Sequence, residues 1–137
     1  MALFGLMGCG KEVGRIPMTG PGEAETSVSL EAKQGLALWT KLDVSWDGSF
    51  DAHYAVELRD ASGSAVATAT CDPLDVGTKL GSVETTLGAH HSKSYSGKMR
   101  CQLVAPADGT YTVHAKLQYD TMPATLSVKD ISLVLKL

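Results

Sequence analysis

The alternation of apolar and polar residues constrains the fold of this chain most strongly. In the segment from Leu36 to Trp46, the apolar side chains of one strand face fall on even positions, interrupted only by Thr40. In the segment 110–119, apolar residues take the odd positions and polar residues the even ones. Successive side chains of a β-strand point to opposite faces, so this period of two predicts strands with one face buried. No segment shows a convincing amphipathic helix pattern.

Other parts of the chain show the same pattern more weakly. Five further strands are predicted at 27–33, 53–59, 64–71, 83–87 and 98–104. In the run 124–137 the apolar residues lie on even positions before Lys129 and on odd positions after Asp130, and a β-bulge there would keep both sets facing inward. Seven or eight short strands separated by turn residues predict an all-β fold, a two-sheet antiparallel β-sandwich with Greek-key connections.

Length, composition and charge narrow the class of protein. The chain has 137 residues, which suggests one domain, and its 44% hydrophobic content argues against disorder throughout. Its net charge is −3, so no electrostatic attraction to nucleic acid is expected. No apolar run approaches the roughly 18 to 20 residues of a membrane-spanning helix.

The N-terminus carries a short motif, Leu6-Met7-Gly8-Cys9, which resembles the lipobox of bacterial lipoproteins. In that family the cysteine receives a diacylglyceryl group and becomes the first residue of the mature protein. The resemblance implies lipidation at Cys9, with residues 1–8 as the remnant of a signal peptide. It also implies a lipid-anchored protein of the bacterial cell envelope, on the periplasmic or the surface side. Only eight residues precede Cys9 and none is basic, whereas secretory signals usually begin with basic residues.

The residues after Cys9 fit an anchored domain. The segment 10–25 contains four glycines and two prolines and has no sustained period, which predicts a flexible tether over 9–25 and a folded domain over 26–137. If Cys9 carries lipid, Cys71 and Cys101 remain as a pair. A disulfide bond between them would stabilise the fold by roughly 3 to 4 kcal/mol and would indicate an oxidising compartment. The alternative is two buried free thiols in a cytoplasmic protein.

The stretch 106–113, "PADGTYTV", resembles the start of a late strand in immunoglobulin-like and related Greek-key or jelly-roll sandwiches. There a tyrosine packs over the corner, and its hydroxyl bonds back to the backbone. The resemblance gives this role to Tyr111. Val113 stands where an antibody domain has its second cysteine, so the resemblance supports the sandwich class and not membership of the immunoglobulin family.

Two places offer candidate ligand-binding residues. The segment 88–100 gathers His90, His91 and several cations around Tyr95, which suits a metal ion or an anion. Adjacent residues of an extended strand point to opposite faces, however, so the two histidines would chelate poorly, and we expect a solvated surface loop and no metal site. Trp39 lies off the phase of its apolar neighbours, where an exposed indole could stack on a sugar ring. Alternatively, the N-terminal strand or another loop covers it.

Catalytic signatures are missing from the sequence. It has no G-x-S-x-G elbow, no phosphate-binding glycine loop and no H-E-x-x-H, so we expect no enzyme and no cofactor. The leading hypothesis is a non-catalytic, membrane-anchored envelope lipoprotein that acts as a structural or protein-binding module, with a protein partner in the envelope. The alternative is a carbohydrate-binding β-sandwich module that uses Trp39 and the loops near it to bind a glycan.

Overall fold

The fold is all-β, as the alternation predicts. A computed structural model describes residues 11–137, and this part of the chain contains nine strands and no helix, hence none that could cross a membrane. The strands are β1 (Glu12–Pro17), β2 (Gly22–Leu30), β3 (Gly35–Asp47), β4 (Asp51–Arg59), β5 (Ala65–Cys71), β6 (Val76–Leu87), β7 (His90–Val104), β8 (Gly109–Thr121) and β9 (Thr125–Lys136).

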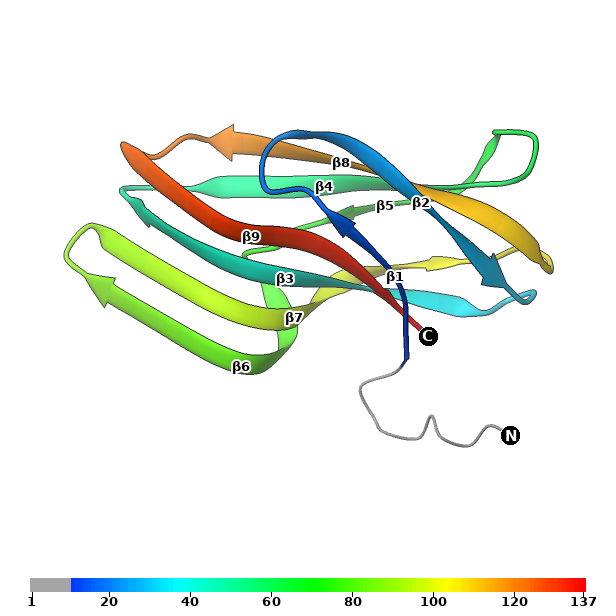
Figure 1. Ribbon diagram of the computed structural model, residues 1–137, viewed down its shortest axis with the longest axis horizontal. Helices are drawn as coiled ribbons and strands as arrows, with labels where there is room; N and C mark the ends of the chain where they lie inside the picture. Colours follow the sequence, from blue (N-terminus) through cyan, green and yellow to red (C-terminus); the bar gives the residue numbers. More distant parts are fainter. Residues whose placement is uncertain (1–10) are drawn as a thin grey trace.

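The strands form two antiparallel sheets that pack face to face (Figure 1). The five-stranded sheet has the order β1-β9-β3-β7-β6, and the four-stranded sheet has the order β2-β8-β4-β5. The predicted two-sheet antiparallel β-sandwich is therefore confirmed.

The connectivity is that of one long hairpin rolled into two layers. Strands from the two halves of the chain pair in turn, β1 with β9, β2 with β8, β3 with β7, and β4 with β5. Rolling then brings β9 beside β3 and β8 beside β4. This is the jelly-roll arrangement of Greek-key strands. Strand β6 is not part of this rolled hairpin, since β7 is its only partner in the sheet.

The core lies between the sheets and is built from the alternating positions. Its largest fully buried side chains are Leu36, Leu38, Leu42, Val44, Tyr54, Leu58, Met99, Leu103, Leu117, Ile131, Leu133 and Leu135. Thr40, the polar residue that interrupts the apolar set of β3, also points inward and is fully buried. Its hydroxyl lies 3.4 Å from that of Tyr54, so each buried hydroxyl has a partner. Burial also raises the pKa of Tyr54.

The change of phase in the C-terminal run is a β-bulge, as predicted. Along β3, the neighbours Asp43 and Val44 pair with Asp130 and Val128 of β9, so Lys129 is the extra residue. Beyond it the odd positions of β9 face the core. The corner tyrosine is confirmed as well, because the Tyr111 hydroxyl donates to the carbonyl of Ala107.

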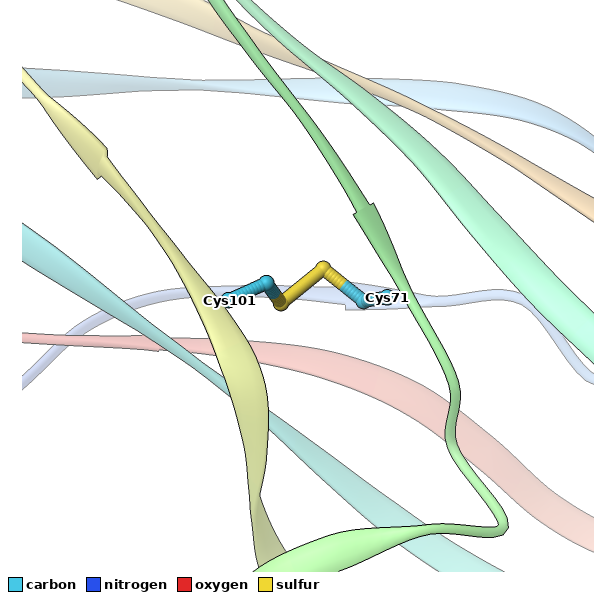
Figure 2. The surroundings of a disulfide bond; sticks show 2 residues. All are labelled: Cys71 and Cys101. Atoms are coloured by element: carbon cyan, nitrogen blue, oxygen red, sulfur yellow. A yellow bond between two sulfur atoms is a disulfide. The ribbon is translucent and has the colours of Figure 1, made fainter.

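The predicted disulfide bond joins the two sheets (Figure 2). Cys71 ends β5, an edge strand of the four-stranded sheet, and Cys101 lies in β7 of the five-stranded sheet. Their Cα atoms are 5.7 Å apart. The bond therefore crosses the core and fastens one layer to the other, as Figure 2 shows.

The segment predicted as a flexible tether contains two strands. β1 occupies 12–17 and β2 begins at Gly22, so the paired part of the chain begins at Glu12 and not at Thr26. Pro17 ends β1, Gly20 and Pro21 lie in the turn and Gly22 begins β2, whereas Gly14 lies within β1. β1 is held by its ladder with β9 and by Ile16, which is buried in the core.

The predicted surface loop over 88–100 is also different in the structure. β6 and β7 form a long hairpin, and β7 begins at His90, immediately after the turn residues Gly88 and Ala89. Gly88 has φ of 62°, the conformation that glycine supplies at the first position of a two-residue hairpin turn. β6 also begins at Val76, well before the predicted strand 83–87. The predicted strands 83–87 and 98–104 are parts of β6 and β7, so β1 is the added strand that makes nine where seven or eight were predicted.

Candidate functional site

Trp39 is buried, although it lies on the outer face of the five-stranded sheet. It sits between Lys98 of β7 and Val134 of β9, and only 4% of its surface is exposed. The Nζ atom of Lys136 lies 4.0 Å from the centre of the indole, a cation–π contact that covers the ring. A side chain of the C-terminal strand β9 thus helps to cover the indole. The indole offers no free face for a sugar ring.

The two adjacent histidines point to opposite faces of β7, as strand geometry requires. On the outer face, His90 Nδ1 lies 3.1 Å from a carboxylate oxygen of Asp47. The same carboxylate accepts a hydrogen bond from Thr125, and these two contacts, Thr125 first, lower the pKa of Asp47. On the other face, the His91 ring stacks on Trp46 with centroids 5.2 Å apart. The histidines therefore do not converge on a common ligand.

Tyr95 has a structural contact of its own. It is 3% exposed, and its hydroxyl donates a 2.7 Å hydrogen bond to the carbonyl of Pro73 in the β5–β6 connection. Burial raises its pKa. The Nζ atom of Lys79 lies 5.3 Å from the ring centre and helps to cover it. Tyr95 thus ties β7 to the preceding connection and does not present its hydroxyl to a ligand.

The four candidate ligand-binding residues do not form one site. Trp39 and His90 share the outer face but lie at distant positions along the ladder of β3 and β7, whereas His91 and Tyr95 point to the other side of β7. Within residues 11–137, no three side chains of His, Cys, Asp or Glu lie close enough together to hold a metal ion. Cys9 lies outside the described residues.

An open hollow of about 460 Å³ lies on the outer face of the five-stranded sheet. It is bounded by β6 on one side and by β9 on the other, and its lining is polar and of mixed charge. The lining includes Lys41, Asp43, Ser94, Ser96, Lys129 and Asp130, with Leu80 and Gly81 at the β6 margin. Leu42 and Tyr95 also line the hollow, although both are buried residues of the core. The hollow can accept small polar groups, but it lacks a nucleophile paired with a base.

Strand β6 is the most unusual surface of the described chain. Every residue from Gly77 to Leu87 is exposed, so neither face of the strand is covered by the other sheet. The exposed residues include three large apolar side chains: Leu80, Val83 and Leu87 are 39%, 64% and 81% exposed. In Figure 1, β6 forms the free lower edge of its sheet, beyond β7. The sequence pattern did not identify this surface, because exposed strands lack amphipathic alternation.

A small charged network lies on the other face of β6. The carboxylate of Glu84 accepts hydrogen bonds from Lys79 at 2.6 Å and from Ser82 at 2.8 Å. The Nζ atom of Lys93 in β7 lies 3.5 Å from the other oxygen of the same carboxylate. These contacts, the Lys79 hydrogen bond first, lower the pKa of Glu84.

Comparison with known proteins adds no family to this description. No protein-family model matches the sequence, and no curated protein matches it either.

Proposed function

We propose that this chain is a non-catalytic, lipid-anchored protein of the bacterial cell envelope, in which the β-sandwich serves as a structural or protein-binding module. The disulfide bond between Cys71 and Cys101 is the observation that supports this proposal best. Disulfide bonds persist in oxidising compartments and are rare in the cytosol. With two cysteines joined, Cys9 is the one left for acylation, and it stands in the lipobox-like motif.

The position of β1 sets how the anchor would hold the domain. Only Gly10 and Lys11 separate Cys9 from the first residue of β1. Even fully extended, this link spans only about 10 Å, at roughly 3.3 to 3.6 Å per residue. Lys11 is moreover held to Leu137 by two backbone hydrogen bonds of 3.0 and 2.9 Å. The lipid would therefore fix both the location and the approximate orientation of the sandwich, with the end that holds the C-terminus near the membrane.

The envelope role that follows is presentation of a surface to a protein partner. Among the described residues, the uncovered strand β6, with its apolar outer face, is the most suitable surface for such contact. The carbohydrate-binding alternative depended on an exposed indole, and Trp39 is covered by Lys136. The buried indole therefore gives that alternative no support.

Membrane fractionation tests the proposed anchor. We expect the protein, expressed from its own gene, to sediment with membranes and to partition into a detergent phase. A Cys9→Ser variant should move to the aqueous phase, since a protein without acyl chains has no anchor. A variant with both Cys71→Ala and Cys101→Ala is the control, because it removes the other two cysteines, leaves no unpaired thiol behind and keeps the anchor intact. The proposal is wrong if the wild-type protein and the Cys9→Ser variant are equally soluble.

A further inference from the structure

Strand β6 is an edge that nothing in the described chain covers. It lies outside the rolled hairpin that makes the sandwich, and β7 is its only neighbour in the sheet. An edge strand leaves a row of backbone N–H and C=O groups unpaired, and those groups can pair with another strand. An exposed strand of this length with three exposed apolar residues is therefore a candidate for intermolecular pairing.

The two faces of β6 have different chemistry. Leu80 and Val83 pair with Ser96 and Ser94 of β7, so they point to the outer face of the sheet. Lys79 and Glu84 pair with Gly97 and Lys93, on the face that also holds Tyr95. One face of the edge is thus apolar at its centre, and the other carries one positive and one negative group.

A β-bulge restricts which strand can pair with β6. Between the pairs Leu80–Ser96 and Val83–Ser94, β6 advances three residues while β7 advances two. The extra residue lies at Gly81-Ser82, where Gly81 has φ of 62°. A regular strand along the free edge would meet the same mismatch, and its side chains would change faces relative to β6 at this point. A second copy of β6 carries the same extra residue. The two strands then advance by the same number of residues across the bulge, and paired side chains stay on the same face.

From this geometry we propose that two copies of the chain associate through antiparallel pairing of β6 with β6. The two-fold axis passes between Gly81 and Ser82, and the two five-stranded sheets become one continuous sheet. This register places Leu80 opposite Val83 of the second copy on the outer face. It places Lys79 opposite Glu84 of the second copy on the other face, and each pair occurs twice by symmetry.

The register is favourable on both faces. Cross-strand apolar pairs and pairs of opposite charge stabilise a sheet, whereas like charges directly opposite each other destabilise it. Here the apolar side chains cover each other, and charges of opposite sign alternate across the axis. Next along the edge, Thr78 meets Thr85 of the second copy, and both lie on the outer face. The pairing does not depend on acylation of Cys9, so it can be tested separately from the proposed function.

Sedimentation velocity tests the association directly. The full chain with Cys9→Ser, which prevents acylation and bridging through that thiol, is measured from about 1 µM to about 300 µM, a range suited to a weak interface. We expect the mass to rise from that of one 14.4 kDa chain to that of two. Val83→Lys should abolish the increase, whereas Met122→Lys should not. Val83 and Met122 are each 64% exposed, and Met122 lies in the β8–β9 connection.

A charge-reversal pair tests the register. Lys79→Glu places acidic groups opposite each other in a homodimer, and Glu84→Lys does the same with basic groups, so each variant alone should stay monomeric. Mixed together, the two variants have opposite charges facing each other at both positions, and the dimer should return. Both variants lose the Lys79–Glu84 contact within the chain, so a purely local role predicts no recovery on mixing.

Circular dichroism and thermal unfolding show whether each variant is folded. The proposal is overturned if the folded wild-type chain stays monomeric across the concentration range. It is also overturned if Val83→Lys and Met122→Lys associate equally. Dimers that form without recovery in the charge-reversal mixture would exclude this register and with it the β6–β6 pairing described.

Discussion

At the scale of single residues, Gly97 shows how closely the β6–β7 hairpin packs. A Cβ atom at this position would lie 2.7 Å from Cγ2 and 3.0 Å from Cβ of Val76. Val76 is the one buried residue of β6, and it enters the core over Gly97. The glycine is therefore required for close contact and not for an unusual backbone conformation.

Replacing this glycine should destabilise the fold. We expect Gly97→Ala to lower the free energy of unfolding by about 1 to 3 kcal/mol, the usual range for overpacking a well-filled core. Gly35→Ala is the matched control, since its Cβ would meet only the Gln102 side chain at 3.7 Å. Urea denaturation of both variants provides the measurement. Equal free energies of unfolding for the two variants would contradict the packing argument. So would a Gly97→Ala substitution that lowers the free energy of unfolding just as much when Val76 is already replaced by alanine.

Residue-level predictions from the sequence succeeded where a residue's environment is set by its own strand. Trp46 was placed on the buried face of its strand by its phase in the segment 36–46, and it is buried. Trp39 could not be placed in the same way. It is covered by Lys136, almost a hundred residues away, and strand periodicity carries no information on such a contact.

At the scale of elements, the bulge in β9 has the clearest consequence. Lys129 is the extra residue of this bulge. It lets Leu126 and Val128, before the bulge, face the same way as Ile131 and every second residue after it. Since a one-residue slip moves every side chain of a strand to the opposite face, the bulge sets the register of the whole strand.

Deleting Lys129 should therefore cost far more than replacing it. The fully buried part beginning at Ile131 should keep its place, and Leu126 and Val128 should turn toward solvent. We expect the deletion to lower the free energy of unfolding by about 2 to 4 kcal/mol, from the burial lost by these two side chains. Lys129→Ala, which keeps the residue count, should stay within about 0.5 kcal/mol of wild type. Similar losses in both variants would exclude this role for the bulge.

The elements that the sequence missed share a physical cause. β3 and β8 were predicted because each buries one face, and burial of one face is what produces alternation. The part of β6 before Val83 was missed, and from Gly77 onward it buries neither face, so its side chains follow no period. β1 is short and depends on a ladder with β9, at the other end of the chain. The turn at Gly88-Ala89 was the one local signal of the β6–β7 hairpin.

At the scale of the whole molecule, two features bear on the proposed function. The jelly-roll sandwich is closed by a disulfide bond between its layers, and its first strand begins three residues after the proposed lipid attachment site. Under the proposed function, these features would hold the domain close to a membrane in an oxidising compartment, with β6 as the exposed edge. The candidate contact surface on β6 is recognised only from the fold. The sequence pointed instead to Trp39 and the two histidines, which the fold keeps apart.

The intact mass of the full-length protein, purified after expression from its own gene, tests the central claim most directly. We expect a chain that begins at Cys9, carries the added mass of the acyl groups, and is two hydrogens lighter because Cys71 and Cys101 are joined. Alkylation should label no cysteine until the protein is reduced. An unmodified chain in which all three thiols react with the alkylating reagent would contradict both the envelope location and the lipid anchor.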